Sequence, residues 1–274
     1  MNKPLVLLSA VCVTLSLAIG VAWPGGAPPA AATPATATPA KAAAAVPLAA
    51  RPKGHYAALD ALPDWGGVWV LSRPPPGSPP PEKPMPKGKY LQDYQAWQKD
   101  VESKGGQVPH EGSYCTPPGM PGIMSLGQYP IEFLFTPGRV TTHHEAWMQW
   151  RNIYTDGRGH PEDLDATFQG DSIGHWEGGT LVAETVGLKD SVALSMGIKH
   201  SDKMRIGERI HLAKDDPDTL VVETTVEDSE ALTKPWAHTL TFKCSRDMQL
   251  LEFECAENDR NPVDANGNTG FKRQ

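Results

Sequence analysis

The sequence has few cysteines and none of the short motifs that mark the common enzyme classes. It contains four cysteines, and no two of them are spaced as a zinc-binding pair. It has no H-E-x-x-H, P-loop, G-x-G-x-x-G or G-x-S-x-G motif, and no Asp-rich calcium loop. These absences argue against metalloproteases, NTPases, dinucleotide-dependent enzymes and ordinary serine hydrolases. We therefore expect no metal and no cofactor.

The chain also lacks an excess of positive charge. Its 25 Lys and Arg residues are outnumbered by 32 Asp and Glu residues, which gives a net charge of −7. An acidic chain without a basic run is poorly suited to nucleic acid or to an anionic membrane surface. We expect a small, partly apolar molecule as the partner, and the oligomeric state stays open.

Only one long hydrophobic run is present, and it lies at the N-terminus. Lys3 precedes the apolar stretch Leu5–Val21, and Gly20-Val21-Ala22 is a small-x-small cleavage signal. We expect a signal peptide at 1–22, with a retained membrane anchor as the alternative. An Ala/Pro-rich disordered linker follows at 23–52, and a single domain at 53–274. The processed protein should have no membrane span and should be periplasmic or secreted.

Short alternating segments dominate the domain. Turn residues between them favour antiparallel pairing, so we expect a mainly β fold, a closed lipocalin-like barrel, with a two-sheet sandwich as the alternative. Gly66-Gly67 before Trp69 is similar to the first strand of such a barrel. The strands are expected at Val68–Leu71, Ile131–Phe135, Arg139–Glu145, Trp147–Tyr154, Ser172–Glu177, Thr180–Val186, Lys203–Leu212, Thr219–Val226, Trp236–Lys243 and Leu250–Cys255.

Two segments depart from the strand pattern. Lys89–Ser103 carries apolar residues at helical intervals and ends at Gly105-Gly106, which predicts one amphipathic helix on the sheet or across a barrel end. Gly112–Gly127 is rich in Gly, Pro and Met, and long loops of this kind are often lids. Cys115 within it indicates a lid that is tied down.

Glu208 is the most informative charged residue. It shares one face of Lys203–Leu212 with Met204, Ile206 and Ile210, so alternation predicts that its carboxylate is buried. Burial raises a carboxyl pKa and makes the group usable as a general acid or base. The alternative is a structural ion pair with Arg205, Arg158 or Arg209.

A polar loop with the sequence YTDGRGHP supplies further candidates. Arg158 can bind a carboxylate or stabilise an oxyanion, and His160 is a candidate general base. Tyr154 can donate a hydrogen bond. Asp156 can act in the site, or it can simply cap its own turn before Gly157.

The hairpin after this loop turns at Gly178-Gly179, where a two-residue turn needs positive φ. On its first strand His175 and Glu177 share a face and can form an acid–base pair, unless both are simply solvated. The adjacent His143 and His144 point to opposite faces of their strand, so only one of them, His144, should face inward.

The runs YPIEFLFTPGRVT, IYTDGRGHP, SIGHWEGGTLVAETVG and TKPWAHTLTF resemble a large group of exported bacterial proteins, mostly uncharacterised. The likeness extends from Leu62 to Asn258. Gly179 and Asp202 depart from the group's pattern, and His175 is not part of it. The resemblance implies these functional positions: Tyr154, Asp156, Arg158, His160, Trp176, Glu177, His200, Ser201, Glu208 and Trp236.

We expect an exported small-molecule enzyme that uses metal-independent acid–base chemistry, as a lyase, isomerase or hydrolase. His160 or His200 would be the base and Glu208 the buried acid, with Tyr154, Arg158 and Asp156 in the same pocket. The expected substrate-binding residues are Trp176, Glu177, Trp236 and Ser201. The alternative is a periplasmic lipocalin-like ligand-binding protein without catalysis, which would need a mostly apolar interior.

The cysteines that remain after export are odd in number, so one disulfide and one free thiol are expected. A hairpin register centred on Asp247 does not place Cys244 opposite Cys255. Cys115 and Cys255 both lie in runs that resemble the exported group, whereas Cys244 has no counterpart there. We therefore predict a Cys115–Cys255 bond with Cys244 reduced.

Overall fold

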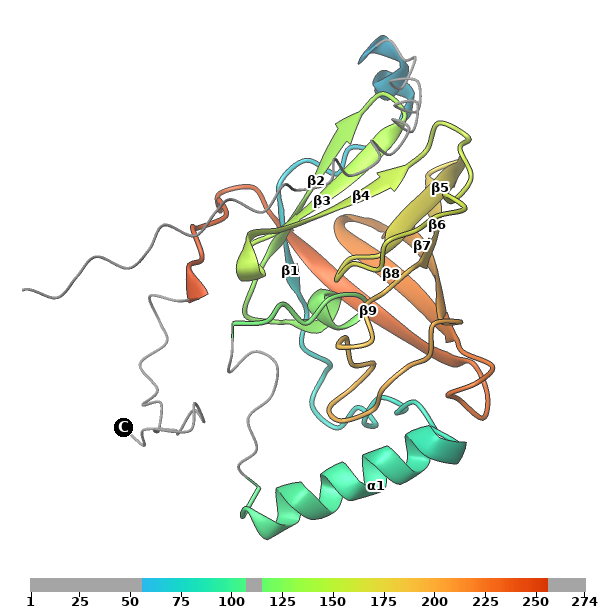
Figure 1. Cartoon of the computed structure of the whole chain (residues 1–274). Helices are drawn as coiled ribbons and strands as arrows, with labels where there is room; N and C mark the ends of the chain where they lie inside the picture. Colours follow the sequence, from blue (N-terminus) through green and yellow to red (C-terminus); the bar gives the residue numbers. More distant parts are fainter. Residues whose placement is uncertain (1–55, 107–114, 256–274) are drawn as a thin grey trace, which may run out of the picture. The chain divides into compact units, whose positions relative to one another are not determined.

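The structure is a computed structural model that describes residues 56–106 and 115–255. Within them nine strands close into a barrel in the order of the sequence (Figure 1), so the predicted mainly β barrel is confirmed. The strands are β1 (Val68–Leu71), β2 (Ile131–Thr136), β3 (Arg139–His144), β4 (Gln149–Tyr154), β5 (Asp171–Glu177), β6 (Thr180–Val186), β7 (Arg205–Ala213), β8 (Asp216–Glu227) and β9 (Trp236–Ser245).

The predicted hairpin forms β5 and β6. Gly178 adopts a φ of 59° between them, a value that glycine takes without strain. Along β6, Leu181, Ala183 and Thr185 are buried and the residues between them are partly exposed. This alternation gives each strand one face toward the barrel interior and one toward solvent.

One neighbouring pair of strands is parallel. All other pairs are antiparallel, but β4 and β5 run in the same direction. Their pairing is short, with only Ile153 opposite Ser172 and Tyr154 opposite Ile173. The first half of β4 therefore has no hydrogen-bonded strand on this side. A parallel pair also needs a crossover connection, which residues 155–170 supply.

Aromatic rings fill one part of the interior. Trp69 is almost fully buried, and its indole Nε1 donates to the Trp65 carbonyl at 3.0 Å. The Trp65 ring lies 5.2 Å from Phe133 and 5.4 Å from Trp176, measured between ring centroids. These rings carry much of the apolar core.

The α-helix α1 (Gly88–Ser103) lies within one residue of its predicted position. None of its residues is buried. Its Trp97 packs against Gly197 in the loop between β6 and β7. Apart from α1, the described helices are the short 3-10 turns η1 (Tyr56–Ala61), η3 (Gly122–Ser125) and η4 (Ala146–Met148).

The predicted lid-like loop is partly packed into the core. Its described part contains η3, and Met120, Ile123 and Met124 are buried. The predicted disulfide is confirmed, since Cys115 is bonded to Cys255 and Cys244 is free.

The predicted last strand, Leu250–Cys255, does not form. The Leu251 backbone N–H donates instead to the Glu145 carboxylate, so side-chain bonding replaces strand pairing there. The expected signal peptide and linker lie outside the described residues. Within the part of the chain that the structure describes, no helix has the length and apolarity that crossing a membrane requires.

Candidate functional site

A buried cluster of polar side chains lies inside the barrel around Arg151 of β4. The Arg151 Nε donates to Ser172 Oγ at 3.0 Å, and Nη2 donates to Thr185 Oγ1 at 2.8 Å. Nη2 also donates to Glu208 Oε2 in a close ion pair. The Arg151 and Glu208 side chains are 1% and 0% exposed. Side chains from three other strands, β5, β6 and β7, therefore hold this guanidinium in place.

Strand register extends this cluster into a polar belt across the interior. Thr142 of β3 is opposite Arg151, and Ser172 of β5 is opposite Thr185 of β6. Glu208 of β7 is opposite Thr224 of β8, which is opposite His238 of β9. Because these positions all belong to inward-facing rows, the alternation of each strand brings the polar groups to one level.

Several atoms of this polar belt have no hydrogen-bond partner among the described residues. They are buried donors and acceptors, namely Arg151 Nη1, Glu208 Oε1, His238 Nδ1, and Nδ1 of His144, whose Nε2 lies 3.0 Å from Thr142 Oγ1 of the belt. Burial, and to a smaller extent the nearby Arg151 charge, lower the pKa of His144 to about 3. Burial also lowers the pKa of His238, against the opposing effect of Glu208. Both rings are therefore favoured in their neutral form.

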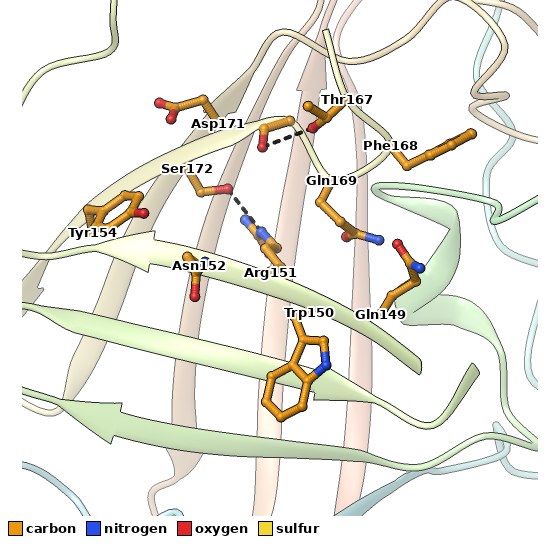
Figure 2. Close-up of a pocket in the computed structure, with 11 residues that line it drawn as sticks. Gln149, Trp150, Arg151, Asn152, Tyr154, Thr167, Phe168, Gln169, Asp171 and Ser172 are labelled. Carbon is orange, nitrogen blue, oxygen red and sulfur yellow. Dashed lines mark hydrogen bonds between the residues drawn. The ribbon is translucent and has the colours of Figure 1, made fainter. Parts of the chain in front are cut away.

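A cavity of about 340 Å³ opens where β4 and β5 are not paired. We call this cavity the slot. Its floor contains Arg151 and Ser172, and its rim contains Tyr154 and Asp171 (Figure 2). Gln149, Trp150, Asn152, Thr167, Phe168, Gln169 and Gly170 complete its lining. The slot thus connects the outer face of the barrel with the guanidinium of the polar belt.

Gln169 is the unusual side chain of the slot. It is only 8% exposed, and neither atom of its amide has a hydrogen-bond partner among the described residues. Figure 2 shows it facing Gln149 across the slot. The Gln149 amide is already used, since Nε2 donates to the Trp147 carbonyl at 3.1 Å. Next to Gln169, the Phe168 carbonyl accepts from Met120 N–H at 3.0 Å, which fixes the segment.

At the rim, Asp171 belongs to a chain of charged groups on the outer face. Its Oδ1 lies 2.5 Å from His160 Nδ1, and His160 Nε2 lies 3.2 Å from Glu184 Oε1. Arg205 in turn donates to Glu184 at 2.6 Å. Both ring nitrogens of His160 are thus engaged by carboxylates, and the group that lines the slot is Asp171 itself.

Arg158 and Asp156 form a local pair beside the same rim. Arg158 Nη2 donates to Asp156 Oδ2 at 2.6 Å, and this hydrogen bond lowers the pKa of Asp156. The Arg158 guanidinium also lies 3.8 Å from the centre of the Tyr154 ring. Asp156 therefore orients Arg158 over Tyr154, in addition to turning the chain at Gly157.

The residues predicted to share one pocket are divided by the barrel wall. Glu208 points inward, whereas His160 lies on the outer face with Asp171 and Glu184. His200 shares no contact with either group. Its Nδ1 lies 2.7 Å from the Ser201 carbonyl and its Nε2 lies 2.9 Å from the Lys189 carbonyl. The single pocket predicted from the sequence does not form.

Ser201 is likewise a structural residue in this arrangement. Its backbone N–H donates to Asp228 Oδ2 at 2.6 Å, and its hydroxyl donates to Asp228 Oδ1 at 2.7 Å. Asp228 also accepts from the backbone N–H groups of Glu230 and Ala231. Together with His200, Ser201 therefore fastens the loop before β7 rather than contributing to the slot.

The other predicted binding residues also lie away from the slot. Trp176 packs in the aromatic core, 5.6 Å from Phe135. Glu177 is on the outer face, where Arg209 donates to it at 2.9 Å and thereby lowers its pKa. Trp236 stacks on His238 at 4.4 Å, and its indole Nε1 donates to the Glu82 carbonyl at 2.7 Å.

Glu208 is paired with none of the three arginines expected from the sequence. Arg205 and Arg209 differ from Glu208 by odd numbers of positions in the same strand, so alternation turns them outward. The partner is Arg151, and its position two residues before the buried Ile153 could have indicated an inward arginine. Gln169 lies in an irregular segment, where no pattern predicts which side chain is buried.

Among the described residues no group of His, Cys, Asp and Glu side chains is arranged to hold a metal ion. Comparisons with models of known protein families and with curated proteins gave no match. The resemblance to exported bacterial proteins therefore remains an expectation, and the function has to be argued from the slot.

Proposed function

We propose that this protein is an exported enzyme that performs acid–base chemistry on a small, partly apolar molecule bound in the slot. The observation that carries the proposal is the state of Arg151 at the slot floor. Three side chains hold its guanidinium, while Nη1 remains without a partner among the described residues. A fixed donor in a water-poor site can stabilise negative charge that develops on a substrate oxygen.

Proton transfer is assigned to Asp171 at the slot rim. His160 lies against its carboxylate, and Glu184 and Arg205 fix the other side of the ring. In this proposal Asp171 takes or gives the proton, and His160 is its positioning residue. Glu208 fixes Arg151 and is not the acid, because its close partner is a guanidinium.

A ligand-binding protein without catalysis is the second candidate. The charges of Arg151 and Glu208 neutralise each other within the protein, and both ring nitrogens of His160 and of His200 are engaged. A site whose titratable groups satisfy one another can recognise a ligand without changing it. The slot residues and the ligand would be the same in both cases.

The proposed location is the periplasm or the extracellular space. The Cys115–Cys255 disulfide fits an oxidising compartment. The N-terminal sequence fits export, with Lys3 before an apolar run and a small-x-small cleavage signal. Both features support a protein that meets its small molecule outside the cytoplasm.

The test incubates pure protein with a metabolite extract and follows the composition of the extract. We expect wild type to change the amount of a small set of compounds, and Asp171→Asn to lower the rate by at least about 100-fold. Glu177→Gln is the matched control, since Glu177 lies outward on the same strand and away from the slot. Retention of a compound without conversion would favour the binding protein. An unchanged rate in Asp171→Asn would refute the assigned role.

A further inference from the structure

We infer that the slot recognises an electrically neutral ligand that presents a hydrogen-bond acceptor beside a donor, as a carboxamide or a lactam does. The inference rests on the proposed function in taking the slot as the binding site. It adds the chemical class of the ligand and gives Gln169 the role of determining specificity.

The charges around the slot argue against an ionic ligand. The charge of Arg151 is balanced by Glu208, with which it is in direct contact. Arg158, beside the rim, is bound to Asp156. An anion in the slot would lie near Asp171 and would compete with Glu208 for the guanidinium. A cation would lie against Arg151. Beside Arg151, in the buried part of the slot, either ion would lose its hydration without gaining an unmatched counter-charge.

Gln169 supplies the complementary hydrogen-bonding edge. Its amide can donate through Nε2 and accept through Oε1, and both atoms are buried without a partner among the described residues. Arg151, which also lines the slot, adds Nη1, a buried donor without a partner among the described residues. A carbonyl oxygen with an adjacent N–H matches this set, because it accepts from the donors and donates to the amide oxygen.

The unpartnered amide also carries a prediction about stability. A buried polar group without a partner destabilises the folded protein as long as no ligand is bound. Replacing Gln169 by leucine, an apolar side chain of similar size, removes this penalty. A residue kept for binding should therefore be stabilised by the substitution and should lose its ligand at the same time.

The experiment uses benzamide and benzoate, a matched neutral and anionic pair, titrated into the ¹⁵N-labelled full chain. We expect benzamide to shift the side-chain signals of Gln169 and Arg151, and benzoate to bind at least about tenfold more weakly. Gln169→Leu should weaken benzamide about tenfold or more and raise the melting temperature. Gln95→Leu, at an exposed position of α1 and away from the slot, is the control and should change the benzamide affinity less than about twofold.

Benzoate binding as tight as benzamide would overturn the inference. So would the absence of benzamide binding, or a Gln169→Leu protein that is less stable and still binds. The two proposals fail separately. If the protein binds benzamide through Gln169 but changes no compound in the metabolite extract, the ligand class is supported and the protein is a binding protein without catalysis. If the protein converts metabolites but does not bind benzamide, the enzyme proposal stands and the inferred ligand class is wrong.

Discussion

Arg151 and Glu208 are two charges that the fold has removed from water together. Their side chains are almost wholly enclosed, and the guanidinium has additional hydroxyl partners in Ser172 and Thr185. The attraction between the charges offsets their lost hydration only while both are present. Either charged residue without its partner would therefore lower the free energy of unfolding.

Replacing Glu208 by glutamine should destabilise the protein by about 3–5 kcal/mol, because the Arg151 charge stays buried without its counter-charge. The double replacement Arg151→Met and Glu208→Leu should recover most of this loss. Urea unfolding measures both effects. Glu184→Gln, in a partly exposed pair with Arg205, is the control and should cost at most about 1 kcal/mol. An unchanged unfolding midpoint in Glu208→Gln would contradict the ion-pair reading.

Most single elements could be predicted from the sequence, because alternation and turn residues are local signals. The β5–β6 hairpin and the inward position of Glu208 follow from them. The neighbour of a strand is not a local property. The parallel contact of β4 with β5, and with it the slot, depends on how the chain returns through residues 155–170. Leu250–Cys255 has a strand-like pattern, but its backbone is bonded to the Glu145 side chain instead.

The Cys115–Cys255 disulfide joins the segment before η3 to the segment after β9, across 140 residues of sequence. Reducing it should lower the free energy of unfolding by about 4–5 kcal/mol on the chain-entropy model. Urea unfolding with and without a thiol reductant measures the loss. Cys244→Ser should behave like wild type in both conditions, since Cys244 is not in the bond. A linked peptide containing Cys244 in non-reducing digests would show that the pairing is wrong.

At the scale of the whole molecule, two buried groups make stability depend on pH in the same direction. The pKa of His144 is lowered from 6.5 to about 3, mainly by burial. Between these two pH values the His144 ring is protonated in the unfolded chain but not in the folded protein. Burial works to raise the pKa of Asp228, but hydrogen bonds from Ser201, Ala231 and Glu230 outweigh it and lower the pKa. In both cases the unfolded state takes up protons first as the pH falls.

The free energy of unfolding should therefore decrease as the pH falls below about 6.5, with a slope that approaches about 1.4 kcal/mol per pH unit from His144 alone. Urea unfolding at several pH values between about 7 and 4 measures the slope. His144→Gln should flatten it. His143→Gln, on the outer face of the same strand, should flatten it less, because His143 is less buried. Equal slopes in wild type and His144→Gln would contradict the assignment.

The parallel contact between β4 and β5 also follows from the odd number of strands in the barrel. Around a closed ring, strict alternation of direction is possible only when the number of strands is even. Nine strands must leave one neighbouring pair with the same direction. Here that mismatch falls between β4 and β5, and the loop with Asp156, Arg158 and His160 is the connection that it requires. A barrel of eight or ten alternating strands would have no need of this crossover, and therefore no slot at this position.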